Sequence, residues 1–215
     1  TLRITRNTDF VFDPDSSESL IEEMRTNIKR RSYGKIVRLE VPRKCPAPML
    51  QRLMKMMELP RNVLYRLDGP LDLTFLMKQV ASLPGFDSQR YQPFTPHVDE
   101  RLMVKESIFR TIRGGDLFFY HPYDSFDPIL RFVREAADDP NVLAIKQTLY
   151  RISSRSPLIP SLARAAQKGK QVTVLIEVRA RFDEENNINW CRLLEKAGCH
   201  VIYGVPQWKT HSKIT

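Results

Sequence analysis

The sequence predicts an α/β protein with a mostly parallel sheet in its second half. Three apolar stretches there have strand character, at 142–150, 172–178 and 199–203. Two stretches of helical periodicity separate them, at 158–168 and 187–197, and each ends at a glycine. Strands recurring about every 28 residues with a helix between them are typical of parallel βαβ units with right-handed crossovers.

The first half alternates strands and helices less regularly, which predicts an α+β arrangement. A turn at 13–17 supplies Ser16 or Ser17 as the cap of the first helix. Between residues 84 and 96 lie three prolines, one glycine and no clear period, so we interpret this stretch as an inter-domain linker. We therefore expect two domains, 1–97 and 98–215. The remaining expected elements are strands at 2–12, 35–41, 62–67 and 116–120, and helices at 16–31, 46–58, 71–83, 107–113 and 125–137.

The composition is that of a globular protein with a basic surplus. Of its 215 residues, 42% are hydrophobic and 27% are charged, which argues against a disordered chain. The formal net charge of +9 indicates a polyanionic partner: phosphate chains, nucleotides, nucleic acid or acidic lipid. Aromatic residues do not interleave with the basic ones as stacking platforms would require, so we expect no nucleic-acid partner.

Three cysteines without metal-ligand spacing suit structural thiols in a reducing compartment. No apolar run approaches the ~18 residues of a membrane span, and no signal peptide opens the chain. The chain begins in strand-like sequence and stops inside a motif. We therefore expect it to be a segment of a longer protein.

Basic residues follow each of the three strands in the second half. Arg151 follows the first, Arg179 and Arg181 follow the second, and His211 with Lys213 lies beyond the third. In open parallel sheets, ligands gather at the carboxyl ends of the strands. One arginine alone would be a solvated loop charge, but three basic elements in phase with the sheet predict a shared anion site.

The spacing of His211 and Lys213, two residues apart, suits chemistry at a phosphoryl group. On extended backbone, residues i and i+2 project from the same face, so the imidazole and the ammonium would point at one small volume. A neutral imidazole can attack phosphorus, and a neighbouring lysine can hold a phosphoryl oxygen. By spacing alone, an ordinary surface histidine in a basic loop remains the alternative.

The acidic run Asp183-Glu184-Glu185 also has two interpretations. It could form a metal-binding or phosphate-orienting cluster, or it could be a helix N-terminus where acids complement the helix dipole. We favour the helix terminus, with some acids pairing with Arg179 or Arg181. His121, in His121-Pro122-Tyr123, is either a residue at the edge of the sheet or an ordinary turn histidine.

Four longer segments resemble the polyphosphate kinases that phosphorylate themselves on histidine. The first hundred residues are similar to the same family in layout, though more loosely. The matching segments are His-Pro-Tyr-Asp-Ser-Phe at 121–126, Ile-Lys-Gln-Thr-Leu-Tyr-Arg at 145–151, Ala-Arg-Phe-Asp-Glu-Glu-Asn-Asn-Ile at 180–188 and Lys-Thr-His-Ser-Lys at 209–213.

The resemblance implies a phosphotransferase that moves the terminal phosphate of ATP reversibly onto inorganic polyphosphate through a phosphohistidine. His211 matches the phosphorylated histidine, and Arg151 and Arg181 match positions assigned to a Mg²⁺–phosphate site. A guanidinium has no lone pair to give, so these arginines would bind phosphate oxygens that share the metal. Lys213 would bind phosphate beside them.

The resemblance also implies an organisation and a setting. Residues 1–97 would be the middle domain, and 98–215 an incomplete first phospholipase-D-like catalytic domain. The family's second histidine motif and further nucleotide contacts would lie outside this segment, which we therefore expect to be inactive alone. A cytoplasmic, homo-oligomeric full-length enzyme is implied, with membrane association as an alternative.

Two other functions remain open from the residues. A phospholipase-D-like phosphodiesterase or nuclease also attacks phosphorus with the histidine of a His-x-Lys motif, but it pairs two copies. Within this sequence, His211 is the one histidine followed by lysine at i+2. A non-catalytic polyanion-binding module is the other alternative.

Overall fold

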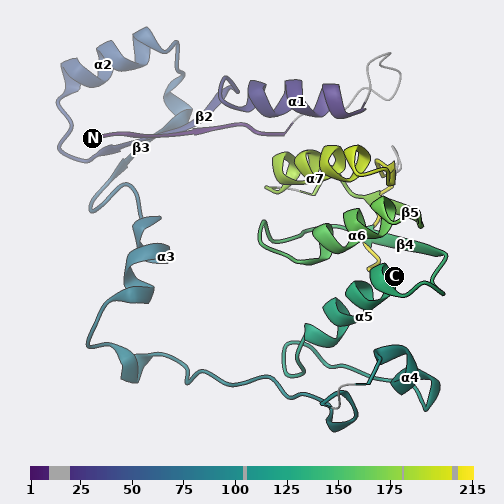
Figure 1. Cartoon of the computed structure of the whole chain (residues 1–215). Coiled ribbons are helices and arrows are strands. Elements are labelled where there is room, and N and C mark those ends of the chain that lie inside the picture. The colour runs from purple at the N-terminus through teal and green to yellow at the C-terminus, as the bar shows by residue number, and fades with distance from the viewer. Residues whose placement is uncertain (10–19, 104–105, 181, 205–207) are drawn as a thin grey trace. The chain divides into compact units, whose positions relative to one another are not determined.

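The computed structural model describes residues 1–9, 20–103, 106–180, 182–204 and 208–215 (Figure 1). The chain forms two compact units. One comprises residues 1–12 and 26–92, and the other comprises residues 13–25 and 93–215. Each unit contains a three-stranded sheet. The architecture is therefore α/β, as the sequence predicts.

The first unit is built on the sheet β1-β2-β3. β1 (Arg3–Arg6) runs antiparallel to β2 (Ile36–Pro42), and β2 runs parallel to β3 (Leu64–Leu67). α2 (Ala47–Met56) contributes Leu50 to a core shared with Leu39 and Val41 of β2.

A carboxylate is buried on the central strand of that sheet. Glu40 of β2 is only 6% exposed, and its two oxygens face the Nε atoms of Arg38 at 2.7 Å and Arg3 at 3.7 Å. A buried carboxylate is tolerated when it has partners, and these two arginines supply them inside the sheet.

The helix predicted at 71–83 is shorter in the structure. The Asp72 carboxylate accepts hydrogen bonds from the Thr74 backbone N–H at 2.9 Å and from its hydroxyl at 2.7 Å, so this part is a turn. The helix α3 (Phe75–Gln79) begins after it. The described part of the first half also contains α1 (Leu20–Arg31) and the 3₁₀ turns η1 (Arg61–Val63), η2 (Val80–Ser82) and η3 (Asp87–Gln89). The predicted cap at Ser16 or Ser17 lies outside the described residues.

The second unit carries the parallel sheet β4-β5-β6. The strands β4 (Ala144–Leu149), β5 (Gln171–Ile176) and β6 (His200–Ile202) are hydrogen-bonded in sequence order and all run parallel. Its helices are η4 (Glu100–Leu102), α4 (Ile108–Arg113), α5 (Asp127–Asp138), α6 (Leu158–Gln167) and α7 (Glu184–Lys196). The predicted βαβαβ order is confirmed.

The core of this unit lies between the sheet and its helices. Val172, Val174 and Ile176 alternate along β5 and are fully or almost fully buried, as are Leu162 of α6 and Leu194 of α7. Gly169 and Gly198 adopt φ values of 84° and 94°, each two residues beyond the last residue of α6 and α7 respectively. This left-handed conformation is easiest for glycine, which is why the two predicted helix ends are correct.

One expected strand is wrong. Residues 116–120 form no regular strand, because the chain turns back on itself immediately afterwards. The Tyr120 backbone N–H donates to the Asp124 carboxylate at 2.6 Å, which closes this turn. Separately, within the described residues, no helix combines the length and apolarity needed to cross a bilayer.

Candidate functional site

The ends of β4 and β5 are tied together by a buried side chain from α7. Tyr150 and Arg151 directly follow β4, and Glu177 directly follows β5. The Asn187 amide nitrogen donates to the Tyr150 carbonyl at 2.8 Å and to the Glu177 carbonyl at 3.0 Å. Asn187 has no exposed surface. Its position therefore fixes the spacing of the two strand ends from which the site is built.

Glu177 connects the end of β5 to the segment that carries His211. Its carboxylate is completely buried. One oxygen accepts the Arg179 backbone N–H at 3.0 Å and lies 3.7 Å from the Arg179 guanidinium. The other oxygen accepts the Thr210 backbone N–H at 2.9 Å. The Arg179 guanidinium in turn donates to the Trp208 carbonyl at 2.9 Å, so this charged pair holds both Trp208 and Thr210.

Thr148, near the end of β4, holds the other side of the same segment. Its hydroxyl donates to the Ser212 carbonyl at 2.8 Å and accepts the Ile214 backbone N–H at 2.7 Å. Its backbone N–H donates to the Ile214 carbonyl at 2.9 Å. Residues 209–215 form no regular strand or helix, but these bonds lay the segment along the end of the sheet.

The predicted site residues gather around the aromatic ring of Tyr150. The His211 ring meets the Tyr150 ring edge-on, with centroids 5.0 Å apart and planes at 78°. The Lys213 ammonium lies 4.5 Å from the centroid of the same ring, and the Arg151 guanidinium carbon lies 5.6 Å from it. Lys213 also donates a hydrogen bond to the His211 carbonyl. Two cations and one imidazole therefore surround one aromatic ring.

A pocket of about 590 Å³ opens beside this cluster. Tyr150, Arg151 and Lys213 line it, whereas His211 is exposed and is not one of its lining residues. Arg151 also lines a second hollow, of about 390 Å³, together with Asp183. The Arg151 Nε lies 3.7 Å from the Asp183 carboxylate, so this arginine pairs with an acid from the run that precedes α7.

The structure brings three of the four predicted site residues together. His211, Lys213 and Arg151 gather around Tyr150, whereas Arg181 lies outside the described residues. Glu184 and Glu185 occupy the first turn of α7, as the helix-terminus interpretation predicts. Among the described residues, no group of three or more His, Cys, Asp or Glu side chains is placed to hold a metal ion.

Sequence reasoning missed four residues of the site: Thr148, Tyr150, Glu177 and Asn187. A signal existed for one of them. Glu177 is the single acid in the apolar run 172–178, and an acid inside such a run must find partners if it is buried. The other three act through tertiary contacts that leave no mark on local sequence pattern.

Comparisons with known proteins assign both halves of the chain to one family. Residues 107–215, just over half of the chain, match the family model of the polyphosphate kinase C-terminal domain 1. Residues 1–79 match that of the polyphosphate kinase middle domain.

Individual relatives agree with the family models. The chain is 50% identical to the polyphosphate kinase of Staphylococcus haemolyticus over 216 residues, covering 100% of this chain and 30% of the relative. It is 44% identical to polyphosphate kinase 1 of Chlorobaculum tepidum, covering 99% and 30%. The crystal structure of polyphosphate kinase from Porphyromonas gingivalis shares the fold, with a TM-score of 0.68, 24% identity and coverage of 99% of this chain and 28% of that one. The chain spans about 30% of the length of these curated relatives, and it belongs to the polyphosphate kinase family.

Proposed function

We propose that this chain supplies the phosphorylated histidine and part of the phosphate site of a polyphosphate kinase. The enzyme would transfer the terminal phosphate of ATP reversibly to inorganic polyphosphate through His211. We further propose residues 1–97 as the middle domain and 98–215 as the first phospholipase-D-like catalytic domain. The family matches at 1–79 and 107–215 support this division.

The observation that carries the proposal is the cluster around Tyr150. An imidazole and two permanent cations meet at one ring, at the carboxyl ends of parallel strands. This is the arrangement that a phosphoryl group needs, because its oxygens require neutralisation while a nucleophile approaches phosphorus. The aromatic ring restricts how His211 can turn, so the nucleophile is oriented before a substrate binds.

The reaction would take place in two balanced steps. In the first, a ring nitrogen of His211 forms a bond to the terminal phosphorus of ATP as the bond to the bridging oxygen breaks and ADP leaves. In the second, a terminal oxygen of polyphosphate attacks the same phosphorus, and the bond to nitrogen breaks. One histidine thus serves donor and acceptor in turn, which makes the transfer reversible.

Arg151, Lys213 and Arg181 would bind the oxygens of the transferred group. Arginine presents a rigid fork that matches two phosphate oxygens, whereas lysine acts as a point charge. Mg²⁺ bound to the phosphates would neutralise further charge on them. Because the described residues offer no metal-binding cluster of His, Cys, Asp or Glu, Arg151 fits a role in holding metal-bound phosphates rather than the metal itself. We place the enzyme in the cytoplasm, where ATP is available and its three free thiols stay reduced.

The test is labelling of the intact protein that carries this chain with γ-labelled ATP. We expect an acid-labile, base-stable label, which is the signature of a phosphohistidine, and we expect His211→Ala to abolish it. His200→Gln is the matched control, since His200 is exposed on β6, where it pairs with Thr173 of β5. Label that persists in His211→Ala would refute the assignment.

Arg151→Lys separates geometry from charge. The variant keeps the positive charge but loses the two-pronged contact, so we expect weaker binding of ATP and slower labelling with an unchanged melting temperature. Hydrolysis of a phosphodiester without any histidine label would instead favour a phospholipase-D-like hydrolase. Polyphosphate binding that His211→Ala leaves intact, again without a label, would favour a binding module.

A further inference from the structure

A second histidine lines the pocket beside Arg151 and Lys213. His121 comes from the turn that precedes α5, and its side chain forms part of the wall of the 590 Å³ pocket. The proposed reaction uses His211 and assigns no role to His121. Its surroundings decide what its ring can do there.

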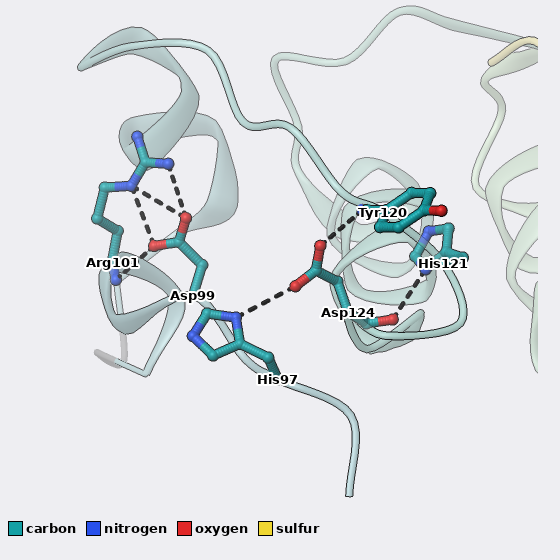
Figure 2. A network of polar contacts seen from close by, with 6 residues as sticks. All are labelled: His97, Asp99, Arg101, Tyr120, His121 and Asp124. Atoms are coloured by element: carbon teal, nitrogen blue, oxygen red, sulfur yellow. Dashed lines mark hydrogen bonds and ion pairs between the residues drawn. The ribbon is translucent and has the colours of Figure 1, made fainter. Parts of the chain in front are cut away.

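The turn fixes which ring nitrogen of His121 carries a proton. His121 Nδ1 lies 2.9 Å from the oxygen of the Asp124 main-chain carbonyl. Figure 2 marks this contact with a dashed line. A carbonyl oxygen only accepts hydrogen bonds, so Nδ1 must be the donor. In the neutral ring, Nε2 then holds the lone pair, on the side of the ring away from this contact.

Asp124 organises the whole turn. Its carboxylate accepts the Tyr120 backbone N–H at 2.6 Å through one oxygen and lies 3.2 Å from His97 Nδ1 through the other (Figure 2). The bond to the Tyr120 N–H, followed by the contact with His97, lowers the pKa of Asp124. The residue therefore stays ionised and keeps the turn closed, with its main-chain carbonyl held beside His121 Nδ1.

Two aromatic rings restrict His121 from the sides. Phe119 lies parallel to the imidazole, with centroids 6.1 Å apart and planes at 6°. Phe126 meets it at 68°, with centroids 5.3 Å apart. The ring is thus oriented before any ligand binds, and preorganisation of this kind reduces the entropy lost on binding.

The pocket suits a phosphorylated ligand. Arg151, Arg155 and Lys213 contribute three permanent cations, and no Asp or Glu is among the described residues that line it. Its volume lies within the range of about 300–1,000 Å³ typical of small-molecule sites. A group with several negatively charged oxygens would interact favourably with these three cations.

We infer that His121 is a further substrate-binding residue, whose Nε2 shares a proton with an oxygen of the terminal phosphate in this pocket. A terminal phosphate loses its second proton at a pKa of about 6, so near neutral pH it can carry or release one proton. The neutral ring accepts from a protonated phosphate, and the protonated ring donates to an ionised one. Either distribution leaves the same nitrogen–oxygen contact. The inference rests on the proposed function, because that function supplies the phosphate ligand.

The test compares two histidines that share Asp124. His121→Asn keeps an N–H donor at the Nδ1 position, for the Asp124 carbonyl, and removes Nε2. His97→Asn makes the same change at a histidine that does not line the pocket. We expect His121→Asn to weaken binding of tripolyphosphate to the intact protein about tenfold or more, as loss of a hydrogen bond to a charged group does. His97→Asn should bind as the unsubstituted protein does. Titration calorimetry measures both.

A measurement without substitution keeps the inference falsifiable if His121→Asn does not fold. Tripolyphosphate should shift the ¹⁵N resonance of His121 Nε2 in the unsubstituted protein and leave the hydrogen-bonded Nδ1 nearly unchanged. An unmoved Nε2 resonance would overturn the inference. So would equal affinity losses in His121→Asn and His97→Asn, because the turn rather than Nε2 would then be responsible.

The two proposals can fail separately. Labelling of His211 with unchanged tripolyphosphate affinity in His121→Asn would remove His121 from the site and leave the proposed function standing. Absence of any His211 label, with a specific loss of affinity in His121→Asn, would refute the histidine carrier and retain the phosphate site.

Discussion

The Thr210 backbone N–H donates to the buried Glu177 carboxylate at 2.9 Å, one residue before His211. On the other side of His211, the Ser212 carbonyl accepts from the Thr148 hydroxyl at 2.8 Å. The proposed phosphoryl carrier therefore lies between two anchors, Glu177 directly after β5 and Thr148 within β4. Its backbone is held while its side chain remains exposed to a substrate.

Glu177→Gln should slow phosphorylation of His211. The amide keeps the shape of the side chain but replaces one acceptor oxygen by an NH₂ group, which cannot accept from both the Thr210 and the Arg179 N–H. Losing one bond to a charged acceptor costs roughly 1.5–3 kcal/mol. Single-turnover labelling should show a slower rate with little change in the concentration of ATP that gives half the maximal rate.

Glu195→Gln is the control for that change, because Glu195 is exposed on α7. A purely structural role for Glu177 would lower the melting temperature and leave the labelling rate of the folded protein at the unsubstituted level. That outcome would contradict its role in positioning His211.

Tyr150→Leu should separate His211 from Lys213, whereas Tyr150→Phe should not. The contacts of both residues are to the ring, and phenylalanine keeps the ring. An edge-on aromatic pair and a cation over a ring each contribute roughly 0.5–1.5 kcal/mol, so we expect about a tenfold slower labelling in Tyr150→Leu. If Tyr150→Phe is equally slow, the hydroxyl rather than the ring is what matters.

Thr148→Val should release the end of the segment that carries His211. Valine matches threonine in shape but has no hydroxyl, so the Ile214 N–H and the Ser212 carbonyl lose their partner. Hydrogen exchange at the Ile214 amide should become faster, by a factor that corresponds to about 1 kcal/mol. Thr148→Ser keeps the hydroxyl and should retain protection; equal exchange in the two variants would contradict this role.

Alkylation should distinguish the three cysteines. Burial raises the pKa of the Cys191 thiol to about 12 and also raises the pKa of Cys199. A thiol whose pKa is raised stays protonated at pH 8, and the thiolate is the reactive form. Iodoacetamide should therefore modify the partly exposed Cys45 in the folded protein and all three after denaturation, as mass spectrometry would show. Rapid modification of folded Cys191 would contradict the burial described here.

Sequence pattern predicts the elements of the parallel sheet because their signals are local. Apolar alternation identifies β4 and β5, and the glycines at 169 and 198 mark where α6 and α7 end. The convergence of Arg151 with His211 and Lys213 follows from one topological rule about strand ends. The pattern at 116–120 looks like a strand, but Asp124 takes up the Tyr120 N–H and the chain turns instead.

The rest of the site depends on contacts between distant residues. Nothing near Tyr150 in sequence indicates that its ring would receive a histidine and a lysine some sixty positions away. Asn187 looks like one polar residue among several at the start of a helix, yet it bonds the ends of two strands. Such roles arise from packing of whole elements, which periodicity does not record.

The hydrogen bonds that hold the segment around His211 use main-chain groups on the segment itself and mainly side-chain groups on the residues that anchor it. Thr210, Ser212 and Ile214 contribute only main-chain groups, whereas Glu177 contributes its side chain and Thr148 its side chain together with its backbone N–H. Every residue type has the carbonyl, and every type except proline has the N–H. Positions 210 and 214 should accordingly tolerate almost any replacement other than proline, and position 212 a still wider range. Positions 148 and 177 should instead require a particular amino acid, although both are far from His211 in the sequence.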